Sequence, residues 1–209
     1  MFIYVAGIPG TGKTSVIKGL VEKLNNDGNK AESIRGLPIL CKLASNISPE
    51  EFRKLPDNVR EKYRPEMFRI IYEEDRNDPY TIRILDGHFI YFEAVGKNFS
   101  VRNIHNEDHE QMKAIFVVNS TPENILGRRT KDISERNDRV IDFNYIQEQL
   151  ELEKNEAIKQ AKELSISIDF INNNGDLKET IQEIDNKVRE RLNLPSEIKE
   201  NKFGKIKLS

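Results

Sequence analysis

The sequence GIPGTGKT at residues 7–14, which follows the apolar run FIYVA at residues 2–6, decides the fold. A continuous apolar run is typical of a strand buried inside a parallel sheet. Glycines let the backbone turn so that several N–H groups point at one anion, and a following helix adds the partial positive charge of its N-terminus. The stretch therefore predicts a phosphate-binding loop between a strand and a helix.

The loop matches the motif G-x-x-x-x-G-K-[ST] in full. In this motif Lys13 reaches the β- and γ-phosphates of a nucleotide, and the Thr14 hydroxyl is a ligand for Mg²⁺. The predicted ATP-binding residues of the loop are Gly7, Ile8, Pro9, Gly10, Thr11, Gly12, Lys13, Thr14 and Ser15.

Short β-rich runs alternate with longer helical patterns along the rest of the chain. We expect helices over residues 14–24, 48–74, from 121 onward, 143–164 and 176–192, and further strands over residues 30–35, 80–85, 114–118 and 166–171. Ser48, Pro49 and Glu51 form a strong helix start, and Pro65 is expected to kink or break the helix that follows. The alternation predicts an α/β fold in which helices cover both faces of a parallel sheet.

Composition limits the class of protein and its partners. We expect one domain over residues 1–192 and a lysine-rich tail over 193–209, which is either a loosely docked terminus or an extra docked helix. The net charge of −2 gives no global attraction to nucleic acid or to an anionic membrane, so neither is expected as a partner. Cys41 has no second cysteine to pair with, and no signal peptide or membrane span is apparent, so we expect a cytoplasmic protein.

A nucleotide-binding loop of this kind also needs an acidic residue at the end of a neighbouring strand. The run RILDGH places Asp86 there, whereas the run FVVNS ends in the neutral Asn119. Asp86 is therefore expected to orient Mg²⁺ or its water, although an Asp-Gly pair is also a common turn. His88 lies either beside the phosphates or in a structural role.

Two basic regions favour phosphoryl transfer over hydrolysis. Residues 128–141 carry a cluster of arginines suited to the charge that spreads over a transferring phosphoryl group, and a lid there would exclude water. The alternative is a solvated helix, since acidic residues are interspersed. The segment 36–75 is longer than one crossover helix, and its Arg53 and Lys54 would form a clamp for a second anion or a charged surface.

These motifs together resemble those of the adenylate kinases, in detail the archaeal type. The similarity covers residues 1–192 and is carried by GIPGTGKT, FRKL, DGH, ILGRR and ERNDR. The family resemblance implies a P-loop kinase fold with a five-stranded parallel sheet, an insertion at 36–75 that binds the nucleoside monophosphate, and a short lid at 128–141. It further implies the Mg²⁺-dependent reaction ATP + AMP ⇌ 2 ADP and, weakly, a homotrimer.

The resemblance also implies roles for individual residues. Lys13, Arg128, Arg136 and Arg139 would act in catalysis, and Arg128 would also contact the donor ATP. Arg53 would hold the acceptor phosphate, with His88 beside it. Bacterial-type members carry DGFPR after the third strand, and its arginine binds the acceptor phosphate, whereas the run DGHFIYF here has no arginine.

Two other functions are compatible with the motifs. ATPases of ribosome assembly that are related to adenylate kinase share the Asp-x-His strand end, and a nucleotide-gated adaptor would need the loop without turnover. The arginine-rich run GRRTKDISERNDR favours the kinase.

Overall fold

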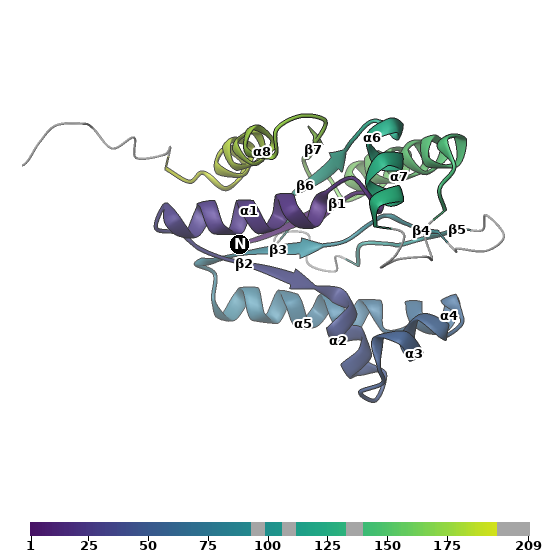
Figure 1. Ribbon diagram of the computed structural model, residues 1–209. Coiled ribbons are helices and arrows are strands. Elements are labelled where there is room, and N and C mark those ends of the chain that lie inside the picture. The colour runs from purple at the N-terminus through teal and green to yellow at the C-terminus, as the bar shows by residue number, and fades with distance from the viewer. Residues whose placement is uncertain (93–98, 106–111, 133–139, 196–209) are drawn as a thin grey trace, which may run out of the picture.

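A computed structural model of the chain describes residues 1–92, 99–105, 112–132 and 140–195 (Figure 1). Its main sheet has five parallel strands in the order β2-β3-β1-β6-β7, which confirms the predicted α/β fold. Their bounds are β1 Phe2–Ala6, β2 Lys30–Arg35, β3 Thr81–Asp86, β6 Met112–Asn119 and β7 Ile168–Asn172. A small antiparallel pair, β4 Ile90–Phe92 and β5 Phe99–Val101, lies beyond β3 in the chain.

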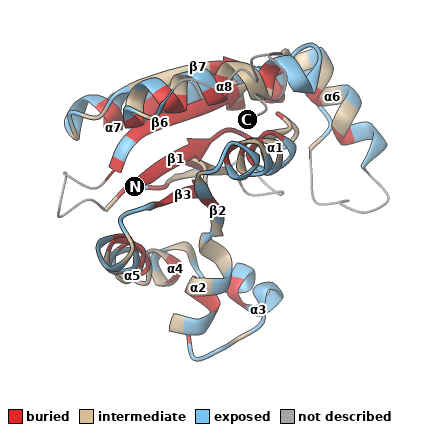
Figure 2. Ribbon diagram, turned by 90° about the vertical axis from the view of Figure 1, so that its left-hand side faces the viewer, coloured by how far each residue is buried: buried red, intermediate tan, exposed pale blue. Residues whose placement is uncertain are grey.

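Helices cover both faces of the sheet. The helices α1 (Lys13–Asn26) and α8 (Leu177–Leu192) pack on one face, and α5 (Arg64–Asn77) and α7 (Phe143–Glu163) pack on the other (Figure 1). Because side chains alternate along a strand, β1 contributes to both cores, with Ile3 towards α1 and α8 and Tyr4 towards α5 and α7. The whole of β1 is buried, as the red central strands of Figure 2 show. The phosphate loop therefore follows a strand that is buried along its whole length.

The chain between β2 and β3 is divided into more helices than the run predicted over residues 48–74. It forms α2 (Gly36–Leu43), α3 (Pro49–Lys54) and α4 (Asp57–Glu61) before α5. The helix start at Ser48 is confirmed, since its hydroxyl accepts from Glu51 N (3.2 Å) and Glu51 Oε2 accepts from Ser48 N (2.8 Å). The break expected at Pro65 is present directly before it, at Lys62 and Tyr63, and Pro65 occupies the first turn of α5, where its missing N–H costs little. A second interruption, which the sequence did not predict, comes earlier, at Leu55 and Pro56.

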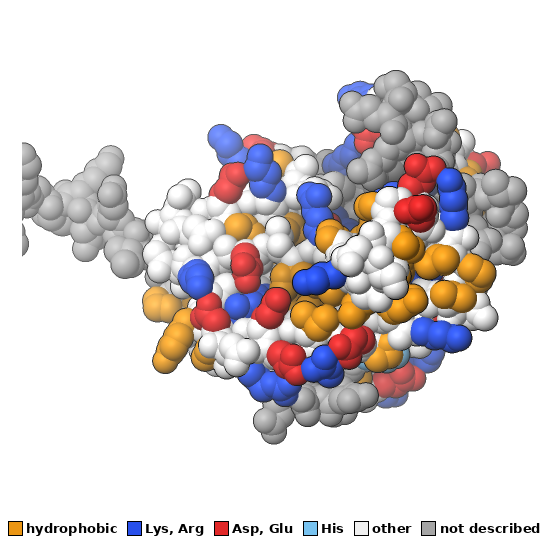
Figure 3. All heavy atoms as spheres, turned by 90° about the horizontal axis from the view of Figure 1, so that it is seen from below, with side chains coloured by type: hydrophobic (Ala, Val, Ile, Leu, Met, Phe, Trp, Pro, Cys, Tyr) orange, Lys and Arg blue, Asp and Glu red, His pale blue; other side chains and the backbone are white. Residues whose placement is uncertain are grey.

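Charges of both signs share the outer face of this helical segment. Figure 3 shows basic and acidic side chains interspersed with apolar ones over α5 and its neighbours. Exposed ion pairs within α5 account for part of this pattern, such as Arg69 Nη2 with Glu66 Oε1 at 2.5 Å. Such exposed pairs contribute little to the free energy of unfolding, so the main effect of these charges is to keep this face hydrated.

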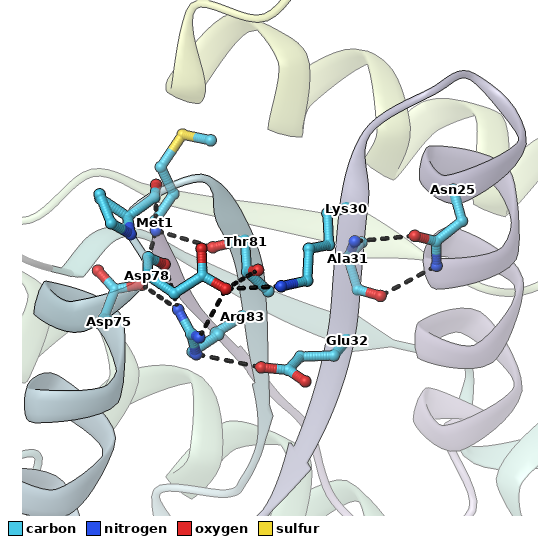
Figure 4. A network of polar contacts seen from close by, with 10 residues as sticks. Met1, Asn25, Lys30, Ala31, Glu32, Asp75, Asp78, Thr81 and Arg83 are labelled. Atoms are coloured by element: carbon cyan, nitrogen blue, oxygen red, sulfur yellow. Dashed lines mark hydrogen bonds and ion pairs between the residues drawn. The ribbon is translucent and has the colours of Figure 1, made fainter.

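An ion-pair network ties the insertion to the sheet at the end opposite the loop (Figure 4). The buried Arg83 guanidinium of β3 contacts Asp75 Oδ1 of α5 at 3.2 Å and Glu32 Oε1 of β2 at 3.1 Å. Asp75 Oδ1 also accepts from the Met1 amine at 2.6 Å. The network fixes the end of α5 against β3, which in turn fixes where the start of α5 lies.

A third apolar cluster anchors the loop itself. Ile8 of the loop packs against Ile125 of α6 (Pro122–Lys131) and Ile146 of α7. The helices α6 and α7, which follow β6 in the chain, thereby help to fix the position of the phosphate loop at the edge of the sheet. Among the described residues, no helix has both the length and the apolar character needed to cross a bilayer.

Candidate active site

The phosphate loop lies at the carboxyl edge of the sheet, where ligands of open α/β sheets bind. β1 pairs with β3 on one side and β6 on the other, so three strand ends converge beside the loop. Gly12 caps α1 with φ +85°, a backbone conformation that favours glycine. Thr11 closes the turn, since its N and Oγ1 both donate to Ile8 O, at 3.3 and 3.0 Å. The predicted loop residues 7–15 therefore form one compact anion-binding turn.

Arg128 and Asn173 hold the carbonyl groups of the loop. Arg128 Nη1 donates to Gly10 O (3.2 Å) and Thr11 O (3.0 Å), and Asn173 Nδ2 donates to Thr11 O (2.7 Å). Arg128 Nη2 donates to Asn173 O (2.8 Å), so α6 and the end of β7 act together. Carbonyl oxygens repel phosphate, and these bonds tie them to donors. Arg128 thus supports the loop directly, while its predicted contact with ATP stays a prediction.

Arg129, the second arginine of the pair, braces the loop from the other side. Its side chain is 2% exposed, and Nε and Nη2 donate to Pro9 O at 3.0 and 2.8 Å. Nη2 also donates to Gln149 Oε1 of α7 (2.8 Å). From the sequence, Arg129 was predicted to belong to the arginine-rich lid. In the structure it is a buried residue of α6 that binds both the phosphate loop and α7.

Lys13 and Asp86 meet beside the loop. Asp86 ends β3 as predicted, in register with Val5, and its Oδ1 forms an ion pair with Lys13 Nζ. Lys13 Nζ also donates to Gly87 O (2.6 Å). The side chains of the pair are 14% and 20% exposed, so the ammonium lies at the mouth of the site rather than inside the core.

The donor set at this edge fits Mg²⁺. The Thr14 hydroxyl is exposed at the start of α1, and Asp86 supplies a carboxylate, both of them hard oxygen ligands. Over the described ranges, no group of three or more His, Cys, Asp or Glu side chains could hold an ion alone. That composition suits Mg²⁺, which keeps several waters and phosphate oxygens among its ligands.

Gly87 has a steric reason to be glycine. A Cβ at this position would overlap the hydroxyl and ring of Tyr4, whose side chain is 1% exposed and donates to His88 O (3.0 Å). We predict that Gly87→Ala lowers the free energy of unfolding by about 1–3 kcal/mol, the usual cost of overpacking. Urea denaturation measures it.

The matched control for this prediction is Gly127→Ala in α6. A Cβ at Gly127 meets no atom within 4 Å, so alanine should be neutral or stabilise by about 0.5–1 kcal/mol. Equal effects of the two substitutions would contradict the close approach of Tyr4 to Gly87.

A group of cations lies near His88 and Tyr91. Arg60 of α4 and Arg102, which follows β5, place their guanidinium carbons 4.5 and 4.8 Å from the Tyr91 ring centroid. The His88 ring lies 6.1 Å from that of Tyr91. Arg64, the first residue of α5, completes the group through its charge on His88. We call Arg60, Arg64 and Arg102 the arginine cluster.

The arginine cluster keeps a surplus of positive charge. Asp57 Oδ1 accepts from Arg60 (3.0 Å) and Arg102 (2.7 Å), and Glu61 pairs with Arg102 and with Arg64 (3.5 Å). Three guanidinium groups thus face two carboxylates among the described residues. Arg60 Nε is buried without a hydrogen-bond partner in that part of the chain. An anion entering beside His88 would meet this surplus on one side and Lys13 on the other.

His88 is expected to remain neutral at pH 7. Burial lowers the pKa of its imidazole well below 6.5, and the charges of Lys13 and the arginine cluster lower it further. NMR titration of the ring should therefore show a midpoint below 6.5, and a bound phosphate dianion should raise it. Because the unfolded imidazole binds its proton first, the contribution of His88 to stability is intact above about pH 6.5 and is lost as pH falls below that value. A midpoint at or above 6.5 without ligand would contradict the placement among cations.

The remaining predicted site residues lie elsewhere. Arg53 is exposed on α3 rather than among the arginine cluster, and Arg136 and Arg139 lie outside the described residues. Sequence reasoning missed Arg60, Arg64 and Arg102. Arg60 and Arg64 belong to the run DNVREKYR, but they lie on different helices, α4 and α5, so their spacing of four gives no helix-face signal.

Comparison with known proteins agrees with the fold and the loop. Residues 6–147 match the family described as an AAA domain. The chain belongs to that family. Two curated relatives of this AAA-domain protein are adenylate kinases, from Thermococcus onnurineus (26% identical) and Pyrococcus horikoshii (28% identical), each covered over 92% of its length by 87% of this chain.

The fold has a solved counterpart. Shikimate kinase from Acinetobacter baumannii in complex with shikimate superposes with a TM-score of 0.53 at 16% identity, over 92% of this chain and 93% of that one. This AAA-domain protein thus has the P-loop kinase fold, and its relatives identify it as a phosphotransferase. The expected similarity to adenylate kinases and the expected enzyme class are confirmed.

Proposed function

We propose that the protein is a nucleoside monophosphate kinase that transfers the γ-phosphoryl group of ATP to AMP, in the reversible reaction ATP + AMP ⇌ 2 ADP with Mg²⁺. The observation that carries this proposal is that Lys13 of the phosphate loop and the arginine cluster both lie close enough to His88 for their charges to act on it. Two groups of cations near one residue suit a reaction between two phosphorylated substrates. The choice of AMP rests on the two adenylate kinase relatives.

The chemistry needs positioning rather than a protein base. An oxygen of the acceptor phosphate is already an anionic nucleophile; it attacks the γ-phosphorus while the bond to the β-phosphate oxygen breaks, leaving two ADP molecules. Lys13 would neutralise charge on the donor phosphates, and the arginine cluster would orient the acceptor phosphate. Mg²⁺, held by Thr14 and Asp86 when bound, would supply further charge neutralisation on the phosphate oxygens.

Further parts of the proposal concern segments and residues known from the sequence alone. We assign residues 36–75 to acceptor binding and residues 128–141 to a lid in which Arg136 and Arg139 close over the transferring group. Arg53, exposed on α3, would contact the acceptor only if that segment moves inward. A cytoplasmic setting suits the buried, unpaired Cys41, and a homotrimer stays a prediction.

An acceptor survey tests the proposal. Purified protein with Mg²⁺ and ATP is incubated with AMP, CMP, UMP, GMP, dAMP or water alone, and ADP is quantified by chromatography. We expect AMP to give the largest rate and water to give little. ATP loss at one rate whatever the monophosphate would overturn the kinase and favour the ATPase alternative, in which a ribosomal partner sets turnover.

A further inference from the structure

One face of α7 carries a row of buried polar side chains. Gln149, Glu153 and Gln160 are spaced so that they project from one side of the helix, and each is at most 4% exposed. Gln149 bonds Arg129 behind the phosphate loop, and Gln160 accepts from Ile104 N (2.9 Å) and donates to Arg102 O (3.1 Å). This row of side chains therefore connects α7 to Arg129 behind the phosphate loop and to the backbone of Arg102 in the arginine cluster.

Glu153 lies at the centre of this row and holds the turn between β3 and β4. Its Oε1 accepts from Phe89 N (3.0 Å) and its Oε2 from Ile90 N (2.8 Å), so both carboxylate oxygens are used. The side chain is 1% exposed, and no cation of the described residues forms an ion pair with it. Burying a carboxylate without a counter-ion is costly, and an apolar side chain would fill the same place without that cost.

We propose that Glu153 is a positioning residue that fixes the turn at residues 87–90 so that His88 lies close to both Lys13 and the arginine cluster. The kinetic part of this inference rests on the proposed function, whereas the geometric part does not. Other contacts hold the carbonyls of the turn and its first N–H group: Lys13 binds Gly87 O, Tyr4 binds His88 O, Arg102 N donates to Phe89 O (2.7 Å), and Gly87 N donates to Val5 O (3.0 Å). Glu153 accepts from the N–H groups of Phe89 and Ile90 and so fixes the orientation of these two peptide planes.

The charge state of Glu153 decides whether both N–H bonds are made. An ionised carboxylate accepts with both oxygens, whereas a protonated one turns one oxygen into a donor. Burial raises the pKa of Glu153 to about 7, opposed by the bonds from the backbone of Phe89 and Ile90, by the charge of Lys13 and by a bond from the backbone of Gly7 in the phosphate loop. The other titratable groups nearby are Tyr4 on β1, Asp86 at the end of β3 and His88 on the turn.

The titration of Glu153 is expected to change activity and stability in opposite directions: as pH rises, activity increases and the free energy of unfolding decreases. Because the pKa is raised in the fold, the stability contribution of Glu153 is fully present below about 4.5 and is lost as pH rises through about 7. The turn, in contrast, gains its second bond as pH rises through the same range. A fall in activity below pH 7 that accompanies unchanged or higher stability therefore marks positioning rather than folding.

The test compares Glu153→Gln, Glu153→Asp and the exposed control Glu151→Gln in the full chain. Glutamine keeps the shape of the side chain but replaces one carboxylate oxygen by an NH₂ group. That group cannot accept a hydrogen bond, so one of the two backbone N–H groups loses its acceptor. Without nucleotide, amide exchange at Phe89 or Ile90 should become about tenfold faster in Glu153→Gln, equivalent to about 1.4 kcal/mol. For AMP phosphorylation, kcat should fall about 10- to 100-fold with the KM for ATP unchanged, and the rise in rate between pH 6 and 8 should disappear.

The outcomes separate the inference from the proposed function. Glu153→Asp keeps the charge and should keep the pH dependence at a lower rate, and Glu151→Gln should behave as wild type. Unchanged exchange at both amides in Glu153→Gln would overturn the positioning role, and so would faster exchange with unchanged kcat. If no monophosphate is phosphorylated at all, the proposed function fails, while amide exchange and the rate of ATP hydrolysis in the same variants still decide the role of Glu153.

Discussion

Replacing Lys13 by alanine is expected to lower AMP-dependent ADP formation by about 10³-fold. The Lys13 ammonium lies beside the loop at the start of α1. Without it, the negative charge on the donor phosphates would not be neutralised by this side chain. The loop itself should persist, because Arg128, Arg129 and Asn173 hold it through its carbonyls. Loss of the pair with Asp86, which is 20% exposed and would lose its partner, should cost about 1–3 kcal/mol. Initial rates at saturating ATP and AMP, with a urea denaturation curve, measure both effects.

Lys18→Ala is the matched control on the same helix. Lys18 is 78% exposed and lies 3.9 Å from Glu22, away from the loop, so its removal should leave the rate unchanged. If Lys13→Ala kept more than about a tenth of the wild-type rate while folded, phosphoryl transfer at this loop would be excluded.

The donor half of the site could be predicted because its signals are local. The strand at residues 2–6, the loop and the start of α1 are contiguous in the chain, and Asp86 directly ends a strand that must lie beside β1. Parallel pairing brings the carboxyl ends of neighbouring strands to one edge, so strand ends alone place these groups together.

The acceptor side could not be predicted in the same way. Arg60 and Arg102 are far apart in the chain and meet only because α4 and β5 both pack around Tyr91. The arginine that bacterial-type adenylate kinases carry after the third strand is absent here, and Arg102 supplies a cation near that turn from a different segment. Arg53 looked equivalent by composition, and nothing local distinguishes it from Arg60.

Helix boundaries in the insertion failed for a similar reason. A periodic pattern ran from residue 48 to 74, and Pro65 was the obvious breaker within it. Proline breaks a helix in its interior but is tolerated in the first turn; here α3 ends before Leu55 and Pro56, α4 covers Asp57–Glu61, and α5 begins at Arg64. That restart places Arg64 on the first turn of α5, next to the rest of the arginine cluster.

Arg60→Met is expected to raise the KM for AMP about 10- to 100-fold, with the KM for ATP within about twofold of wild type. Methionine keeps most of the buried stem and removes the guanidinium, whose Nε is without a hydrogen-bond partner among the described residues. Asp57 retains its bond from Arg102 (2.7 Å), so no buried carboxylate is left alone. Steady-state kinetics with each substrate varied in turn separate the two constants.

Arg60 is a sharper test than Arg102. Removing Arg102 would leave Glu61 paired only with Arg64 among the described residues and would break the link from β5 to α4, so a loss of activity would be confounded with a loss of fold.

The matched control is Arg69→Met on α5, where the guanidinium is half exposed and binds Glu66 and Glu73 on the outer face. A change in the KM for AMP that the two variants share would reflect net charge rather than a site. Equal increases in the KM for ATP and AMP in Arg60→Met alone would place Arg60 between the two substrates, and an unchanged KM for AMP would remove the arginine cluster from the acceptor site.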